Sequence, residues 1–149
     1  MTLSNLVSFL DHKKLIEANK IKDDDDSGFS NRLRIQKYVF IARYFGLRLP
    51  YDFNMHLHGP YSKNLTHDYY QLSDLNNSDG SLASFEKEKF LSLVQGKSDG
   101  WLEIAATILH KKGTVDDDIL LDHVAWIKCD FTGEEIENVY SDLQCSILQ

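Results

Sequence analysis

The chain has 149 residues, of which 42% are hydrophobic and 26% are charged. This length and composition favour a single domain over residues 1–149, with a core that needs neither disulfide nor metal. The longest apolar run, residues 38–42, is far shorter than the roughly 20 residues of a membrane span, and no signal peptide is expected.

The two cysteines, Cys129 and Cys145, match neither the spacing of a metal-ligand pair nor a disulfide framework. We therefore expect two reduced, partly buried thiols and a cytoplasmic location. No cofactor is expected either.

The net charge of −7 is unevenly placed along the chain. Residues 1–63 carry a net charge of +3 and residues 64–149 a net charge of −10. Within residues 32–63, six basic side chains stand against Asp52 alone. A basic module in an acidic chain can offer an anion-binding face, or it can pair head-to-tail with the acidic part of another copy.

Apolar residues at helical spacing predict a first helix from about residue 3 to residue 16. Four adjacent aspartates before Ser27-Gly28 then predict a flexible acidic loop over residues 23–30. Asn31 is the expected N-cap of a second helix over residues 33–45. That helix is apolar on almost every side, which is typical of a helix at the centre of a domain, and Gly46 is placed to end it.

Alternating apolar and polar residues predict a strand over residues 51–58, which Gly59-Pro60 would end. Residues 48–50 could pair with a nearby segment to make a hairpin. Ser62 is the expected cap of a helix over residues 65–75.

A turn is expected at residues 76–80, followed by helices over 85–94, 101–109 and 119–127. Either Ser98 or Asp99 would cap the second of these. Thr132 and Glu135 have the spacing of a capping box, which would open a last helix reaching residue 149. The predicted fold is therefore α+β and predominantly helical, with one short strand or hairpin.

Several of these segments together resemble a known family. They are Asn31-Arg32-Leu33-Arg34-Ile35-Gln36-Lys37-Tyr38-Val39-Phe40, Tyr51-Asp52-Phe53, Leu57-His58-Gly59-Pro60-Tyr61-Ser62 with Leu65, residues 101–109 and residues 131–136. In this pattern the chain resembles small prokaryotic proteins typified by YwgA and, more loosely, the Panacea domain of SocA-like antitoxins. The chain departs from the pattern at Arg34, His56 and His58.

The resemblance covers roughly residues 31–148. It implies a winged-helix-like fold and a role in regulation or defence, and it implies no particular chemistry.

His56 and His58 are the residues that a metal site would use, because two histidines two positions apart on a strand can chelate one ion. No third histidine or cysteine has motif spacing, so solvated histidines are the simpler interpretation. The aspartate runs lack the spaced ligands of a calcium loop, and no nucleophile or phosphate-loop motif is present. The sequence therefore predicts a protein that is not an enzyme.

The basic module gives the main candidates for contact with a partner. Its cations could supply the phosphate contacts of nucleic-acid binding, and its tyrosines could stack on bases. The last two predicted helices have helix-turn-helix spacing, but the second begins with Gly133-Glu134-Glu135, which would repel phosphate. The predicted partner or nucleic-acid contacts are Arg32, Arg34, Lys37, Arg43, Arg48, Tyr61, Ser62 and Lys63.

Three functions follow from these patterns. The leading one is a non-enzymatic regulatory or interaction module, antitoxin-like or defence-associated, that binds a protein partner or a second copy through the basic face. The second is a winged-helix DNA-binding transcriptional regulator that uses the same face. The third is a small metal-dependent hydrolase built on His56 and His58. No membrane partner is expected.

Overall fold

The computed structural model describes residues 3–73, 82 and 84–148. Its elements follow in the order α1 (Leu3–His12), α2 (Asp26–Ala42), β1 (Asn54–His56), β2 (Gly59–Tyr61), α3 (Lys63–Tyr70), α4 (Lys87–Val94), α5 (Asp99–Lys111), α6 (Leu120–Ile127) and α7 (Gly133–Gln144). Short 3₁₀ turns are η1 (Ala18–Lys20), η2 (Arg43–Phe45) and η4 (Asp117–Ile119). This mostly helical chain with a two-stranded antiparallel sheet confirms the α+β class.

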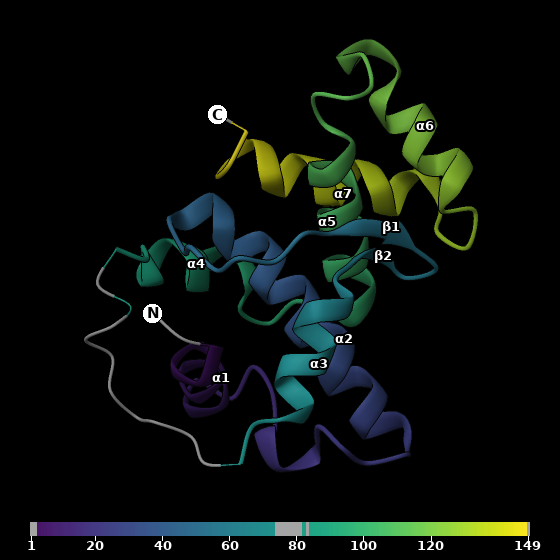
Figure 1. Ribbon diagram of the computed structural model, residues 1–149. Helices are drawn as coiled ribbons and strands as arrows, with labels where there is room; N and C mark the ends of the chain where they lie inside the picture. Colours follow the sequence, from purple (N-terminus) through teal and green to yellow (C-terminus); the bar gives the residue numbers. More distant parts are fainter. Residues whose placement is uncertain (1–2, 74–81, 83, 149) are drawn as a thin grey trace.

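Helices α2 and α5 form the centre of the fold. Eight consecutive residues of each helix are buried, Ile35–Ala42 in α2 and Leu102–Leu109 in α5. Helix α5 contacts α2, β2, α6 and α7. In Figure 1, α6 and α7 lie at one end of the molecule and α1 and α3 at the other, with the hairpin between them. The prediction of a central helix that is apolar on almost every side is therefore confirmed for residues 35–42, whereas residues 43–45, predicted to continue it, form η2.

Helix α2 begins within the run of four aspartates, where the sequence predicted a loop. Helix α2 starts at Asp26, so the predicted loop over residues 23–30 is wrong in its second half. Asp25 is the N-cap and accepts a hydrogen bond from the Gly28 amide at 2.9 Å. Carboxylates are favourable at this end of a helix because the amides there are free and the helix dipole is positive.

Asn31 is consequently not an N-cap but a buried residue inside α2. Its side chain donates to the Ser27 carbonyl at 2.8 Å and accepts from the Glu17 amide at 2.6 Å. The asparagine thus fastens the segment before α2 to the helix.

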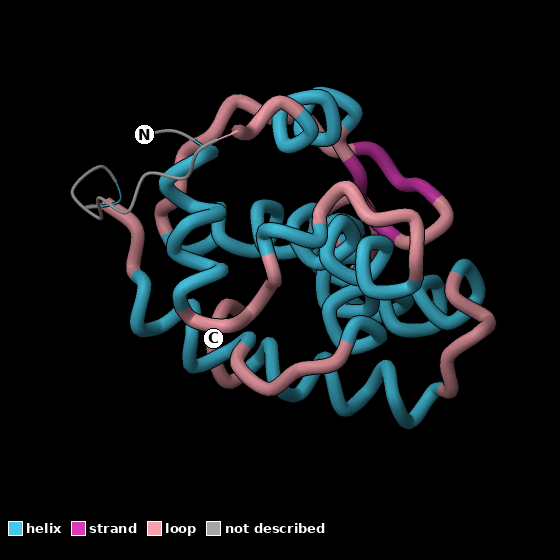
Figure 2. The backbone as a smooth tube through the Cα atoms, turned by 90° about the horizontal axis from the view of Figure 1, so that it is seen from below, coloured by secondary structure: helices cyan, strands magenta, loops and turns pink. Residues whose placement is uncertain are grey.

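The predicted strand over residues 51–58 shortens to β1, and its partner is not residues 48–50. Gly59-Pro60, expected to end the strand, instead begins β2, and Asn54 pairs with Tyr61 and His56 with Gly59. Figure 2 shows this hairpin at one side of an otherwise helical chain. Tyr51 and Phe53 are buried in the core without pairing, whereas Leu57 at the hairpin tip is 83% exposed. The alternation of apolar and polar residues over 51–58 therefore predicts burial correctly at Tyr51 and Phe53 but not at Leu57.

Several predicted helix ends are confirmed. The Ser62 hydroxyl caps α3, the Ser98 hydroxyl caps α5, and Thr132 and Glu135 form the capping box of α7. Gly46 takes the left-handed conformation after η2, with a φ of 91°. Other helices are shorter than predicted: α1 ends at His12, α3 at Tyr70 and α7 at Gln144.

The turn predicted at residues 76–80 lies outside the described residues. Neither Cys129 nor Cys145 is part of a disulfide, and both are exposed rather than partly buried. In the part of the chain that the structure describes, no helix combines the length and the apolar character that a membrane crossing requires.

Gly28 is the residue that lets the preceding segment close onto α2. A Cβ atom at this position would lie 2.0 Å from the Asp23 carbonyl oxygen, so the backbone would have to move. We expect Gly28→Ala to lower the free energy of unfolding by about 1–3 kcal/mol, the usual cost of overpacking. Urea denaturation followed by circular dichroism measures this loss.

Gly133 provides the matched control. It lies in the first turn of α7, where an added Cβ would meet nothing within 4 Å. Gly133→Ala should stabilise the protein by about 0.4–1 kcal/mol, because it restricts the unfolded chain without strain in the folded one. Equal effects of the two substitutions would contradict this account.

Candidate functional site

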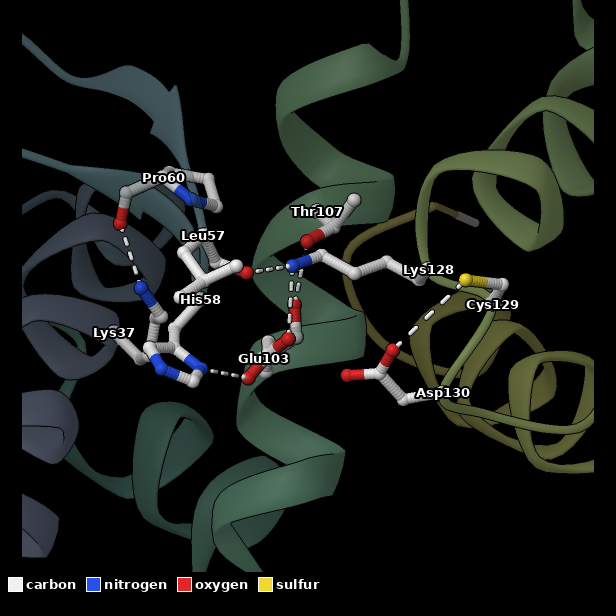
Figure 3. Close-up of polar contacts among 9 residues, drawn as sticks. All are labelled: Lys37, Leu57, His58, Pro60, Glu103, Thr107, Lys128, Cys129 and Asp130. Atoms are coloured by element: carbon white, nitrogen blue, oxygen red, sulfur yellow. Dashed lines mark hydrogen bonds and ion pairs between the residues drawn. The ribbon is translucent and has the colours of Figure 1, made fainter.

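Two buried lysines hold the hairpin against the helices. The Lys37 ammonium of α2 donates to the Pro60 carbonyl at 2.7 Å, and the Lys128 ammonium, just after α6, donates to the Leu57 carbonyl at 2.7 Å (Figure 3). Lys37 is 2% exposed and Lys128 is 5% exposed. Each lysine ammonium therefore donates a hydrogen bond to a backbone carbonyl of the hairpin.

A buried carboxylate on α5 joins these lysines to the hairpin tip. Glu103 is 6% exposed, and its Oε2 lies 2.8 Å from Lys128 Nζ. Its Oε1 lies 3.3 Å from Nδ1 of His58, a half-exposed side chain (Figure 3). We call Lys37, Glu103 and Lys128 the buried charge cluster, which half-exposed His58 borders.

The two lysines outnumber the one carboxylate in this cluster. Burial lowers the pKa of Lys37 from 10.5 to about 8. The Glu103 carboxylate opposes that shift, and the nearby Lys128 ammonium adds to it. Desolvation dominates because water solvates an ammonium better than one carbonyl does.

Gly59 allows the hairpin to lie directly on α5. Its φ is 92°, and an added Cβ would lie 3.0 Å from Thr107 Oγ1 and 3.5 Å from the Glu103 carbonyl oxygen. The Thr107 hydroxyl donates to that same carbonyl at 2.7 Å. A left-handed glycine after a two-residue turn is a common way to close a hairpin, and here it also removes a side chain from the contact.

Gln36, next to Lys37 on α2, holds the start of α3. Its Oε1 accepts from the Ser62 amide, and its Nε2 donates to the Ser62 carbonyl and to Thr66 Oγ1, each at 2.9 Å. Two adjacent side chains of α2 thus bind both ends of Pro60-Tyr61-Ser62. Two of the segments that carry the resemblance, residues 31–40 and 57–62, are therefore in direct contact.

A small pocket of about 210 Å³ lies between α2, the hairpin and α3. Half-exposed Phe29 (47%) and Tyr70 (38%) border it, and the Phe29 ring lies 5.3 Å from the His58 ring. The charged or titratable groups in its lining, apart from the tyrosines, are basic: Arg32, Lys37 and His58. We call it the aromatic pocket; it is lined by Phe29, Arg32, Leu33, Gln36, Lys37, His58, Tyr61, Thr66, Tyr69 and Tyr70.

The aromatic pocket has the chemistry of a binding site for one side chain. It is smaller than the roughly 300–1,000 Å³ of pockets that hold cofactors and drug-sized ligands. Its polar groups are largely engaged: Gln36 with Ser62, and the Tyr61 and Tyr69 hydroxyls with Thr66. An apolar group framed by basic side chains is what this lining would accept.

The structure brings together only some of the predicted contact residues. Arg32, Lys37 and Tyr61 line the aromatic pocket, and Ser62 lies buried beneath it. Arg32 Nη1 donates to the Ile21 and Asp23 carbonyls. Lys37 and Ser62 therefore do not belong to an exposed basic face, as the sequence had suggested.

The other predicted contact residues lie apart from the pocket. Arg34 forms an ion pair with Asp99 at 2.6 Å and donates to the Lys97 carbonyl and the Tyr38 hydroxyl. Arg43 lies over the Phe40 and Phe53 rings at 5.6 and 5.5 Å. Arg48 and Lys63 are exposed.

His56 and His58 do not share a face of one strand. His56 ends β1 and its ring lies 4.7 Å from the Tyr61 ring, whereas His58 lies in the turn and faces Glu103. Among the residues that the structure describes, no group of three or more His, Cys, Asp or Glu side chains is placed to hold a metal ion. No observation on these residues favours the hydrolase hypothesis, which stays a prediction from the sequence.

Sequence reasoning missed Glu103, Lys128, Phe29 and Tyr70. Glu103 carried a usable signal, since it is a lone charge within the apolar run of residues 101–109, and a charge in such a run requires a buried partner. Lys128 carried none, because it follows α6 at a position where an exposed lysine is ordinary.

Comparison with protein-family models, with curated proteins and with solved structures finds no match to this chain.

Removal of the Glu103 carboxylate tests the buried charge cluster. We expect Glu103→Ala to lower the free energy of unfolding by about 3–5 kcal/mol, because Lys128 would keep a buried charge without its partner. Urea denaturation gives the value. The control is Glu86→Ala, whose ion pair with Lys89 is exposed and which should lose less than about 1 kcal/mol. A loss at Glu103 no larger than this control would contradict the cluster's role.

The lowered pKa of Lys37 predicts a stability that depends on pH. Between pH 8 and pH 10.5 the unfolded chain binds more protons at this lysine than the folded chain does, so stability should rise with pH, by at most about 3 kcal/mol. The comparison is with Lys37→Met, which lacks the titrating group. The raised pKa values of buried tyrosines lower stability with pH in both proteins, so the informative quantity is the difference between them. In denaturation series from neutral pH to pH 10.5, the stability of the wild type relative to the variant should rise, and equal slopes would refute the prediction.

Proposed function

We propose that the protein is a non-enzymatic regulatory or interaction module that holds an apolar side chain of a protein partner in the aromatic pocket. The observation that carries the proposal is the pocket itself, a concave aromatic site bordered by half-exposed Phe29 and Tyr70. Interfaces draw most of their binding energy from a few aromatic or arginine anchors in such pockets.

The rigidity of the pocket also supports this function. The Lys37–Pro60 and Gln36–Ser62 hydrogen bonds fasten its hairpin wall and its α3 wall to α2. A site whose walls are already in place loses little conformational entropy when it binds.

The family resemblance supports a role in regulation or defence. The segments that resemble YwgA-like proteins and the Panacea domain include Gln36, Lys37, Pro60 and Ser62, whose hydrogen bonds fasten two walls of the pocket to α2. We accordingly propose an antitoxin-like or defence-associated module. Cys129 and Cys145 are exposed and form no disulfide, which suits the reducing cytoplasm, the location that we propose.

A winged-helix regulator that binds DNA is the second candidate. The observation in its favour is that Arg43, Arg48 and Lys63 are exposed, and the β1–β2 hairpin is the element that a wing would use. Against it, Arg34 and Lys37 are engaged inside the protein, and the first turn of α7 is acidic. We therefore rank this function below the interaction module.

Photocrosslinking separates the two candidates. Tyr70 at the aromatic pocket and Tyr44 beside Arg43 are both exposed tyrosines, at 38% and 45%, so each accepts p-benzoylphenylalanine with little change. We expect residue 70, but not residue 44, to crosslink a distinct protein in host cells. That protein should also bind the purified chain and should bind Phe29→Glu at least about 30-fold more weakly, the effect of a lost interface anchor.

Other results would overturn the proposal. Nucleic acid crosslinked from residue 44 would favour the DNA-binding regulator. A partner whose affinity for Phe29→Glu is unchanged would show that the aromatic pocket is not its site.

A further inference from the structure

Trp126 on α6 is exposed to an unusual degree for so large an apolar side chain. It is 79% exposed, and its ring centroid lies 6.4 Å from that of His123, with the two rings tilted. Ile119, which ends η4 just before α6, is also 50% exposed. Tryptophan is among the residues most enriched at the energetic centres of protein interfaces.

The surroundings of Trp126 are acidic. Asp122 is on the same helix, Asp130 follows it, and Asp116, Asp117 and Asp118 precede it; all five are exposed, and Asp117 forms an ion pair with Lys112. The lining of the aromatic pocket contains no aspartate or glutamate, and its accessible basic side chains are Arg32 and half-exposed His58, because Lys37 is buried and bonded to Pro60. One protein therefore presents an aromatic anchor in an acidic setting and an aromatic pocket with Arg32 and His58 at its rim.

We propose that Trp126 of one copy of this chain occupies the aromatic pocket of a second copy. The inference rests on the proposed use of the pocket as a side-chain site, and it names the occupant as the chain itself. Charge complementarity between α6 and the pocket rim selects this occupant and orients the two copies. The contact joins two different surfaces, so further copies can add until the assembly closes.

Self-association in this form covers the pocket. A protein partner that uses the same pocket then competes with the second copy. The free pocket, and with it the interaction module, becomes more available as the protein is diluted.

Two single variants test the contact by complementation. Trp126→Ala removes the anchor and keeps the pocket, whereas Phe29→Glu places a carboxylate at the pocket and keeps the anchor. Light scattering over a concentration series should show wild-type self-association, weakened at least roughly 30-fold in either variant. A mixture of the two retains one intact contact and should give a heterodimer of twice 17.2 kDa.

The controls are built from the same positions. The double variant Phe29→Glu/Trp126→Ala mixed with Trp126→Ala lacks every anchor and should stay monomeric. Tyr44→Ala removes an exposed aromatic side chain elsewhere and should associate as the wild type does. Circular dichroism establishes that each variant is folded.

A wild-type protein that stays monomeric up to millimolar concentration overturns the inference, as does a folded mixture that forms no heterodimer. If a distinct partner still crosslinks from residue 70 in that case, the proposed function stands without self-association. If residue 70 crosslinks only a second copy, self-association stands and the separate partner does not.

Discussion

The arrangement of this protein depends on two ammonium groups that are taken out of water to hold a hairpin. Lys37 and Lys128 reach Pro60 and Leu57 from opposite sides, and Glu103 lies between them on α5. The hairpin has three residues in each strand, and an isolated two-stranded hairpin is marginally stable at best. Its position therefore comes from the lysines and from the closeness of Gly59 to α5 rather than from its own ladder.

The same contacts define the aromatic pocket. The hairpin carries His58 and Tyr61 into its wall, and Gln36 sets the start of α3 that carries Thr66, Tyr69 and Tyr70. Burial of lysine is expensive unless the charge is paired or hydrogen-bonded, which both lysines here satisfy. A network of this kind gives one arrangement of the walls rather than maximal stability, and a preformed pocket is what a recognition site requires.

The two halves of the charge distribution have separate roles in this arrangement. The basic module does not form one exposed cationic face, because Arg34 pairs with Asp99 and Lys37 donates to the Pro60 carbonyl inside the protein. What remains around the pocket is Arg32 and His58, and the acidic C-terminal half carries the exposed Trp126. The asymmetry of the sequence therefore separates the aromatic pocket from the acidic half that carries this tryptophan.

Local patterns in the sequence predicted the helical class, the central position of residues 33–45 and the helix caps at Ser62 and Thr132. These features could be predicted because helical periodicity and capping depend on residues that are neighbours in the chain. The same patterns misplaced the start of α2, since the charge of four aspartates concealed the N-cap at Asp25. They also could not tell which basic residues are exposed. The burial of Lys37 depends on Pro60 and Glu103, which only the packing of α2, the hairpin and α5 brings to it. The aromatic pocket is likewise a property of three separate elements, and no single segment of the chain encodes it.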